Sequence, residues 1–338
     1  MGIRILSPGF HTTVQDLGRT GFQQYGVPVA GAVDPRSLRL ANLLAGNEES
    51  AAALEATLLP PEIEFTGEGV FAVTGGDFSP TLNGIPLPAY RAVRARTGDV
   101  LRMEAARSGC RCYIAFSGGL DVPVAMGSRS TYEKAHLGGL EGRPLRAGDE
   151  IGILPAALPD NLPARFMPPD DFSAPVKVLR VVLGPQRDRF TEEGVAAFLR
   201  SEYAISSQFD RMGCRLEGAG IAHRQDANII SDGIAFGAVQ VPGSGQPIVM
   251  LADRQTTGGY AKIANVISRD LPLIAQCRAG DRVRFEAISV EEAQAVYLAE
   301  RAEIAALAQR WQRPTGPERR FRISVGGRSY AVDIAELS

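Results

Sequence analysis

A run of polar side chains at residues 253–260 is the strongest candidate for chemistry in this sequence. The run reads Asp-Arg-Gln-Thr-Thr-Gly-Gly-Tyr and combines a carboxylate, a guanidinium, an amide, two hydroxyls and a phenol. It follows the apolar stretch 248–252, which predicts a buried strand. Because Gly258 and Gly259 allow positive φ or close approach to a ligand, we expect the strand to end in a polar pocket lined by backbone. The alternative is a polar hairpin turn at the surface.

A second polar run lies near the start of the chain, at residues 11–19. It reads His-Thr-Thr-Val-Gln-Asp-Leu-Gly-Arg and is followed by turn residues up to Asp34. The stretch is long but lacks the low-complexity composition of a flexible linker. We therefore expect an ordered loop with a function.

Several segments predict the elements that must position these two runs. Asp34 can cap a helix that begins at Pro35 and ends before Gly46. From residue 50 the pattern is one of short strands, and a Gly-Asp pair leading into a strand occurs at 98–103, 148–153 and 280–285. This recurrence indicates that one β-rich unit has been duplicated.

The chain divides into four predicted parts. We expect an N-terminal β domain at 1–160, a Pro-rich connection at 161–175, a second β domain at 176–290, and a helix with a β-hairpin at 290–338. Thr191 is a candidate cap for a short helix in the second domain, and Ser289 with Glu292 forms a capping box before the long C-terminal helix. The alternating run 321–334 predicts the hairpin.

Composition narrows the class of protein. The chain has 338 residues, 45% of them hydrophobic, and a formal net charge of −2, which argues against a nucleic acid or an anionic membrane as partner. We find no long apolar stretch and no signal peptide, so we expect a cytoplasmic protein. Its 4 cysteines and 3 histidines are scattered, which predicts reduced structural thiols and no metal site.

These motifs resemble those of the allophanate hydrolase subunit 2 family, also described as biotin-dependent carboxyltransferase-like. The similarity rests on 12–19, Gly26-Val27-Pro28, Leu54-Glu55 with Thr57, Gln240-Val241-Pro242 and 253–260, and it extends from about residue 3 to about residue 290. The family includes the C subunit of bacterial 5-oxoprolinase and KipA, which antagonises an inhibitor of a sporulation kinase. The resemblance implies a mainly β fold of tandem cyclophilin-like β-barrel domains with a few helices.

The resemblance also implies partners and cofactors. It points to a companion subunit of the allophanate hydrolase subunit 1 or KipI-like type, to a third 5-oxoprolinase subunit as a further option, and to a small amide substrate. ATP would be used by the complex, and biotin would enter only if a partner supplied it, because this sequence has no Met-Lys-Met attachment motif. The closing hairpin resembles the first strands of a biotin-carrier domain, although the sequence ends at Ser338 before an attachment site.

Carboxyl transfer and lactam opening both need donors aimed at an oxyanion and a group that moves protons. Asp16 and Asp253 are candidate bases, although each could instead hold a neighbouring arginine in an ion pair. The predicted catalytic set is Asp16, Asp253, Gln255 and Tyr260. The predicted substrate-binding set is Gln15, Arg19, Arg211, Gln240, Thr256, Thr257, Gly258 and Gly259.

The function that we expect is that of a subunit of an ATP-dependent 5-oxoprolinase, which completes its active site only with partners. One alternative is a carboxyltransferase-like subunit of the urea and allophanate pathway, and another is a non-catalytic protein that binds an inhibitor of a kinase. An allophanate hydrolase acting alone is disfavoured, because the sequence has no Gly-x-Ser-x-Gly elbow.

Overall fold

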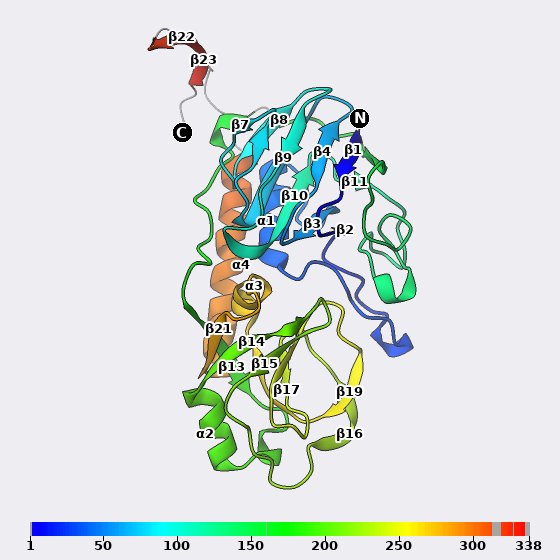
Figure 1. Cartoon of the computed structure of the whole chain (residues 1–338), viewed down its shortest axis with the longest axis vertical. Helices are drawn as coiled ribbons and strands as arrows, with labels where there is room; N and C mark the ends of the chain where they lie inside the picture. Colours follow the sequence, from blue (N-terminus) through cyan, green and yellow to red (C-terminus); the bar gives the residue numbers. More distant parts are fainter. Residues whose placement is uncertain (1, 160, 313–318, 327, 335–338) are drawn as a thin grey trace.

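The structure is a computed structural model that describes all residues except 1, 160, 313–318, 327 and 335–338. Two β-rich halves are stacked along the long axis of the molecule, and a long helix runs along one side of both (Figure 1). The predicted mainly β fold is confirmed. None of the described helices is both long enough and apolar enough to cross a membrane.

The first half consists of two sheets. One has the strand order β11-β12-β1-β4-β9-β6-β7 and the other the order β2-β3-β10-β5-β8. Phe65, Phe71 and Phe116 pack together in a common core with side chains from both sheets. The strands are β1 (Gly2–Ser7), β2 (His11–Gln15), β3 (Ala53–Thr57), β4 (Glu62–Phe65), β5 (Gly69–Asp77), β6 (Thr81–Leu82), β7 (Ile85–Pro86), β8 (Ala92–Ala95), β9 (Val100–Arg102), β10 (Ser108–Phe116), β11 (Leu120–Asp121) and β12 (Glu150–Ile153).

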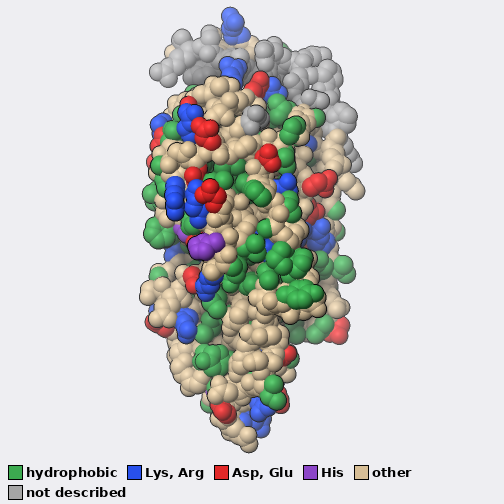
Figure 2. Space-filling model, turned by 90° about the vertical axis from the view of Figure 1, so that its right-hand side faces the viewer, with side chains coloured by type: hydrophobic (Ala, Val, Ile, Leu, Met, Phe, Trp, Pro, Cys, Tyr) green, Lys and Arg blue, Asp and Glu red, His purple; other side chains and the backbone are tan. Residues whose placement is uncertain are grey.

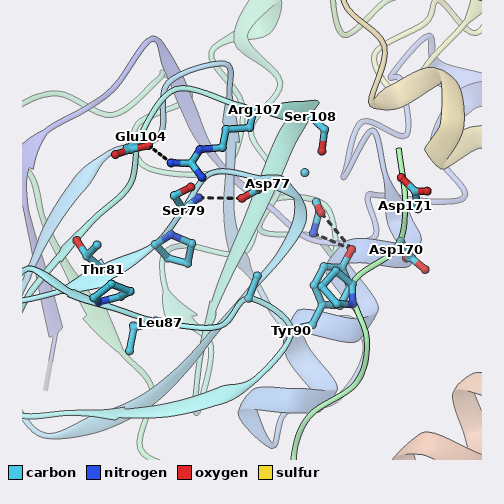
Figure 3. A pocket seen from close by; sticks show the side chains of 16 residues that line it. Asp77, Ser79, Thr81, Leu87, Tyr90, Glu104, Arg107, Ser108, Asp170 and Asp171 are labelled. Carbon is cyan, nitrogen blue, oxygen red and sulfur yellow. Dashed lines mark hydrogen bonds and ion pairs between the residues drawn. The ribbon is translucent and has the colours of Figure 1, made fainter. Parts of the chain in front are cut away.

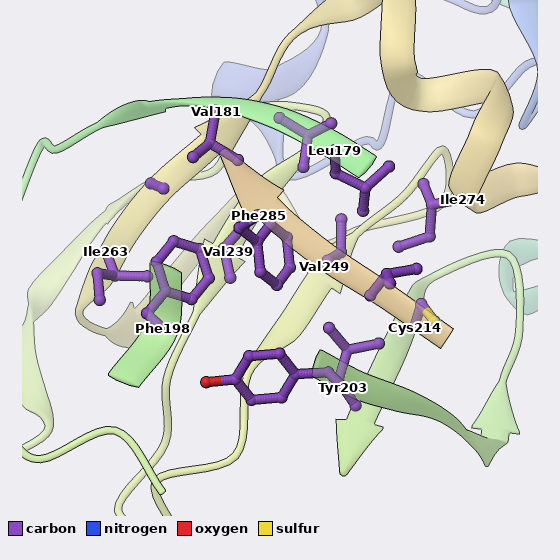
Figure 4. Packing of buried hydrophobic residues seen from close by; sticks show 14 of the residues in the cluster. Leu179, Val181, Phe198, Tyr203, Cys214, Val239, Val249, Ile263, Ile274 and Phe285 are labelled. Carbon is purple, nitrogen blue, oxygen red and sulfur yellow. The ribbon is translucent and has the colours of Figure 1, made fainter. Parts of the chain in front are cut away.

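The second half closes into a seven-stranded barrel, in the order β13-β20-β17-β18-β15-β14-β21. Phe285 lies at its centre, stacked on Phe198 at 4.3 Å between ring centroids, with Tyr203 and Val239 nearby (Figure 4). The strands β16 and β19 form a separate two-stranded arm. The bounds are β13 (Val176–Leu183), β14 (Glu202–Phe209), β15 (Gly213–Glu217), β16 (Asn228–Gly233), β17 (Ala238–Gln240), β18 (Ile248–Met250), β19 (Thr257–Tyr260), β20 (Lys262–Val266) and β21 (Arg282–Ala287).

The capped helices form as predicted. In α1 (Pro35–Ala45) the Asp34 carboxylate accepts a hydrogen bond from the Ser37 N–H, and Gly46 ends the helix with φ of 89°. Thr191 caps α2 (Glu192–Arg200) through the Gly194 N–H. The short helix α3 (Leu271–Ala275) follows the barrel strand β20. Local capping chemistry therefore sets these helix ends.

The long helix α4 (Val290–Gln312) follows the second half in sequence and packs against the first half. Its predicted capping box is present, with Ser289 N–H donating to Glu292 and Glu292 N–H donating to Ser289. Further along, its side chains Ile304 and Trp311 are buried against residues of α1. The predicted C-terminal hairpin is also present as β22 (Arg319–Val325) paired with β23 (Arg328–Ile334).

The recurring Gly-Asp phrase has the same geometry at all three places. The carboxylates of Asp99, Asp149 and Asp281 each accept a hydrogen bond from the backbone N–H of the arginine three residues earlier, at 2.7, 2.7 and 3.1 Å. Each turn then leads into a strand, β9, β12 or β21. This shared turn supports the predicted duplication of a β-rich unit.

Candidate functional site

Arg211 joins the two halves of the molecule through a buried ion cluster. It lies in the turn between β14 and β15, which Asp210 stabilises by accepting the N–H groups of Met212 and Gly213. The Arg211 guanidinium contacts Asp253 in a bidentate pair at 3.0 and 3.1 Å. It also donates to the carboxylate of Glu55 in β3 and, at 2.5 Å, to the carbonyl oxygen of Gly31. One side chain of the second half thus binds two segments of the first half.

Burial raises the pKa of both carboxylates in this cluster and the charge of Arg211 lowers it, but the net shift differs between the two. Burial raises the pKa of Asp253, and the nearby charge of Glu55 adds to this, although Arg211 partly offsets it. Burial also opposes the ionisation of Glu55, but Arg211 and Arg111 outweigh it and lower the pKa of that carboxyl. The charges of Asp253 and Glu55 overcome burial in turn and raise the pKa of Arg211. The predicted base Asp253 is therefore engaged in an ion pair.

Gln276 makes a second polar joint between the halves. Its Oε1 accepts the backbone N–H groups of Cys110 and Arg111 at 2.9 Å each, and its Nε2 donates to Asp34 at 2.9 Å. The junction is thus polar and specific in its hydrogen bonds.

All four cysteines are buried and reduced, as predicted.

The predicted residues of the first loop lie together in the first half. The Asp16 carboxylate accepts from the Gly18 N–H at 2.7 Å, the Ser128 hydroxyl at 2.7 Å and the Arg129 N–H at 2.6 Å, so it anchors two loops to each other. Gln15 and Arg19 are buried and donate to the neighbouring carbonyl groups of residues 131 and 130. Burial lowers the pKa of Arg19, while the charges of Asp16 and Asp253 act against that shift.

The apolar stretch forms the strand β18, which is followed by a turn at residues 252–253, as expected, but the end of the 253–260 run is a second strand rather than a loop. Thr257–Tyr260 form β19, which pairs with β16, and neither glycine has positive φ. Glycine is needed at 258 for space, since a Cβ there would lie 2.7 Å from Ile234 Cδ1. Thr256 accepts the Ile234 N–H through its carbonyl group at 3.1 Å, Thr257 is exposed, and Gly259 lies beside the Ile229 carbonyl group.

Three predicted residues line a pocket of about 440 Å³ on the second barrel: Gln240, Gln255 and Tyr260. Gln240 is 2% exposed, and Tyr260 is 41% exposed at the side of the pocket. Asp253 lies in the turn before these residues and is held in the ion cluster by Arg211. The predicted set is thus divided among the first loop, the ion cluster and this barrel pocket.

Unpaired polar atoms mark the predicted residues. Within the described part of the chain, seven buried side-chain nitrogen or oxygen atoms have no hydrogen-bond partner. Four of them belong to predicted site residues, namely Gln15 Oε1, Arg19 Nη1, Gln240 Nε2 and Gln255 Oε1. A buried polar atom without a partner is costly and rare, so these four atoms, divided between the first loop and the barrel pocket, are candidates for contact with a ligand or partner.

A second pocket, between the halves, contains a pair that the sequence did not reveal. It has a volume of about 390 Å³ and is lined by His11, Glu133, Lys134, Arg211 and Asp253, among others. His11 Nε2 lies 2.6 Å from Glu133 Oε1. The hydrogen bond with His11 lowers the pKa of Glu133. An imidazole held by a carboxylate can transfer protons, but residues 11 and 133 are too far apart in sequence for spacing to predict the pair.

A third pocket, of about 700 Å³, lies in the first half, and none of its described lining residues has a buried side-chain atom without a partner (Figure 3). Arg107 pairs with Glu104 at 2.9 Å, and Tyr90 exchanges hydrogen bonds with Gly75. Asp170 pairs with Arg36 of α1. The carboxylates of Asp77 and Asp171 accept backbone N–H groups, so the acidic side chains of this pocket have partners and it is a weaker candidate. Among the described residues, no cluster of His, Cys, Asp or Glu could hold a metal ion.

The sequence is similar to a known protein family and to several characterised proteins. Residues 25–287 match the family described as carboxyltransferase domain, subdomain A and B. The chain is 39% identical to the 5-oxoprolinase C subunit of Haemophilus influenzae and 40% identical to that of Escherichia coli, over 86% of this chain and 93% of each relative. It is 32% identical to urea amidolyase of Saccharomyces cerevisiae, over 87% of this chain and 17% of that protein.

Solved structures give the same picture of the fold. The crystal structure of the K. lactis urea amidolyase matches with a TM-score of 0.85 and 30% identity, over 90% of this chain and 20% of that chain. The Kluyveromyces lactis urea carboxylase matches with a TM-score of 0.83 and 27% identity, over 100% of this chain and 34% of that chain. This chain thus spans about one fifth of the urea amidolyase and about one third of the urea carboxylase.

Proposed function

The chain belongs to the family of carboxyltransferase domains, subdomains A and B, and we propose that it is the C subunit of an ATP-dependent 5-oxoprolinase, a hydrolase that opens a lactam. The similarity to two 5-oxoprolinase C subunits, over 93% of their length, supports this proposal. The observation that carries it in the structure is the set of unpaired buried atoms on Gln15, Arg19, Gln240 and Gln255.

This chain would supply recognition and stabilisation of charge rather than the base. Asp16 already accepts three hydrogen bonds, and Asp253 is held by Arg211. These contacts fix both carboxylates within the protein, where they have less freedom to reach a proton of the substrate. The free Arg19 Nη1 remains as a donor for a polarised carbonyl group or a carboxylate, and the free Gln255 Oε1 remains as an acceptor for an N–H group. We therefore assign the base of the reaction to a companion subunit.

Partner subunits would also bring the cofactor chemistry. We propose that ATP is a co-substrate of the assembled complex and that biotin plays no part in lactam opening. The companion would be of the allophanate hydrolase subunit 1 or KipI-like type, and the complex would act in the cytoplasm.

Exposed apolar side chains support a protein partner. Tyr25 is 72% exposed and Ile230, on the β16–β19 arm, is 95% exposed. Figure 2 shows hydrophobic side chains gathered on one face near the level where the two halves meet. Apolar groups of this kind favour burial against another protein. We place the companion subunit on this face.

The test is reconstitution of the complex from purified subunits, with glutamate release from 5-oxoproline as the readout. We expect turnover that requires ATP, this chain and the companion subunits, and no turnover when any one is omitted. Equal turnover without this chain would refute the proposal. A stable complex that never opens the lactam would instead favour the regulatory function.

A carboxyltransferase-like function is the second candidate, supported by the fold shared with the K. lactis urea amidolyase at a TM-score of 0.85. It predicts carboxylation of urea when a carboxybiotin donor replaces ATP in the same reconstituted complex. That product in the absence of lactam opening would favour this second function.

A further inference from the structure

The C-terminal hairpin is a predicted element to which the proposed function gives no role. The carboxyltransferase match ends at residue 287, before the hairpin begins. Its strands β22 and β23 pair with each other and with no other strand in the described part of the chain. Phe321 and Ile323, at alternate positions of β22, are 43% and 42% exposed. A two-stranded hairpin alone is at best marginally stable in water, so this one needs a surface that covers its apolar face.

The hairpin carries a surplus of positive charge. Residues 319–334 include four arginines and one aspartate, a formal charge of +3. Successive residues of a strand lie on opposite faces, so Arg319 shares the face of Phe321 and Ile323. Arg322 belongs to the opposite face. The surface that covers the apolar face should therefore combine apolar groups with negative charge.

The pocket of about 700 Å³ in the first half has this complementary composition. Asp77 and Asp171 are exposed residues of its lining, and neither pairs with a cationic side chain of the described residues. Glu104 forms an exposed pair with Arg107, of a kind that contributes little to stability. Carboxylates without a cation and apolar groups thus line one hollow (Figure 3). The apolar residues of the lining are Pro80, Pro86, Leu87, Ala89 and Pro169.

The path of the chain brings the hairpin within reach of this pocket. Trp311, at the end of α4, belongs to the same buried cluster as Tyr90, and Tyr90 lines the pocket. The six residues 313–318 join α4 to β22, and a segment of this length spans roughly 20 Å when extended. Figure 1 shows the hairpin beyond the end of the first half that carries β7, and Pro86 of β7 also lines the pocket. The hairpin and the pocket therefore lie at the same end of the molecule.

We propose that the hairpin docks on this pocket of its own chain. Phe321 and Ile323 pack on the apolar side chains of the pocket, and Arg319 pairs with a carboxylate that lacks a cation, Asp77 or Asp171. Docking removes apolar surface of the hairpin from water and supplies the charge that the pocket lacks. A short linker gives a tethered group an effective concentration of the order of millimolar, so the pocket of the same chain is favoured over that of a second copy.

Distances between two spin labels, measured by pulsed electron paramagnetic resonance on the full chain, test the docking. The native thiols are buried, so the labels attach to the cysteines introduced by I85C and S324C. Ile85 is 68% exposed beside the pocket without lining it, and Ser324 belongs to the face of β22 opposite Phe321. We expect one narrow distance distribution at about 0.1 M salt, which should broaden at about 0.5 M because salt screens exposed ion pairs. A broad distribution at both salt concentrations would overturn the inference.

Substitutions in the pocket test its part in the contact. D77N/D171N keeps the acceptors of the two backbone N–H groups but removes the negative charge, so the distance distribution should broaden. E68Q/E150Q is the matched control, because both of its carboxylates are exposed in the first half and lie outside the pocket. Its distribution should stay narrow. Equal distributions in D77N/D171N and E68Q/E150Q would contradict docking on this pocket.

The hairpin offers a matched pair of its own. R319Q and R322Q remove the same charge from opposite faces of β22, so R319Q should broaden the distribution and R322Q should leave it narrow. F321S/I323S should broaden it as well, because it removes the apolar contact. Equal effects of R319Q and R322Q would contradict docking through the apolar face.

Singly labelled chains show which copy supplies the pocket. A mixture of chains labelled only at position 85 with chains labelled only at position 324 should give no defined distance. A narrow distance in this mixture would place the hairpin on a second copy and overturn docking within one chain. None of the predicted site residues lines this pocket, and the measurement needs neither ATP nor a companion subunit. Its failure and the failure of the proposed function are therefore distinguishable.

Discussion

Removing the Arg211 side chain should destabilise the protein more than any exposed arginine does. In R211M, Asp253 loses both hydrogen bonds of its bidentate pair, at 3.0 and 3.1 Å, and remains 8% exposed. Glu55 loses Arg211 but keeps the Tyr113 hydroxyl at 2.7 Å. One buried carboxylate is therefore left largely uncompensated, and we expect the free energy of unfolding to fall by about 3–5 kcal/mol.

Urea denaturation followed by the fluorescence of Trp311 measures this loss, because Trp311 is the single tryptophan and is buried where α4 meets the first half. R94M is the control, since Arg94 forms an exposed pair with Glu68 that should contribute less than about 1 kcal/mol. The double variant R211M/D253L removes both charges and should recover part of the loss. If R211M lost less than about 1 kcal/mol in the free energy of unfolding, or if the double variant recovered none of the loss, the ion cluster would not be what stabilises the contact between the halves.

Three further predictions follow from the same junction. The pKa of Glu55 is lowered in the folded state, so its contribution to stability is present above about pH 4.5 and is lost as the pH falls through the folded pKa. The variant E55Q should therefore lose stability less steeply than the parent as the pH is lowered. An unchanged dependence of the unfolding free energy on pH in acid would contradict this. Q276A leaves two buried N–H groups unpaired and should cost about 1–3 kcal/mol in urea denaturation, with a loss near zero contradicting the joint. The thiols are buried, and burial raises the pKa of Cys277 to about 12. The native chain should therefore not react with a thiol reagent, whereas the unfolded chain should be modified at all 4 cysteines. Rapid reaction of the folded chain would contradict the burial of the thiols.

Features decided by a few neighbouring residues could be predicted from the sequence. The helix after Asp34 and the capping box of Ser289 and Glu292 depend on hydrogen bonds that span three positions. The Gly-Asp turns are of the same kind. Such short-range chemistry leaves little room for the rest of the fold to change the outcome.

Contacts between distant segments could not be predicted in the same way. Glu55 and Arg211 are 156 positions apart, and their contact depends on how the two halves are placed. A signal was nevertheless present, because a glutamate within the otherwise largely apolar strand Ala53–Thr57 needs a buried partner. The pair of His11 and Glu133 offered no comparable signal.

The 253–260 run shows why a polar motif does not translate directly into one site. We predicted a single polar pocket, whereas Asp253 joins the ion cluster and Gln255 lines the barrel pocket. Asp253 lies in a turn and Gln255 in the irregular segment before β19, so no regular alternation holds their side chains on one surface. Gly258 proved necessary for close packing rather than for positive φ.

The central claim is that the unpaired amides form the substrate site, and kcat/KM for 5-oxoproline in the reconstituted complex tests it most directly. The complex containing Q255M should lose about tenfold or more in kcat/KM. The control is Q246M, because the Gln246 amide pairs with the backbone of Gly218 outside the barrel pocket. The complex containing Q246M should remain within about twofold of the parent. Equal kcat/KM values for Q255M, Q246M and the parent would contradict the claim.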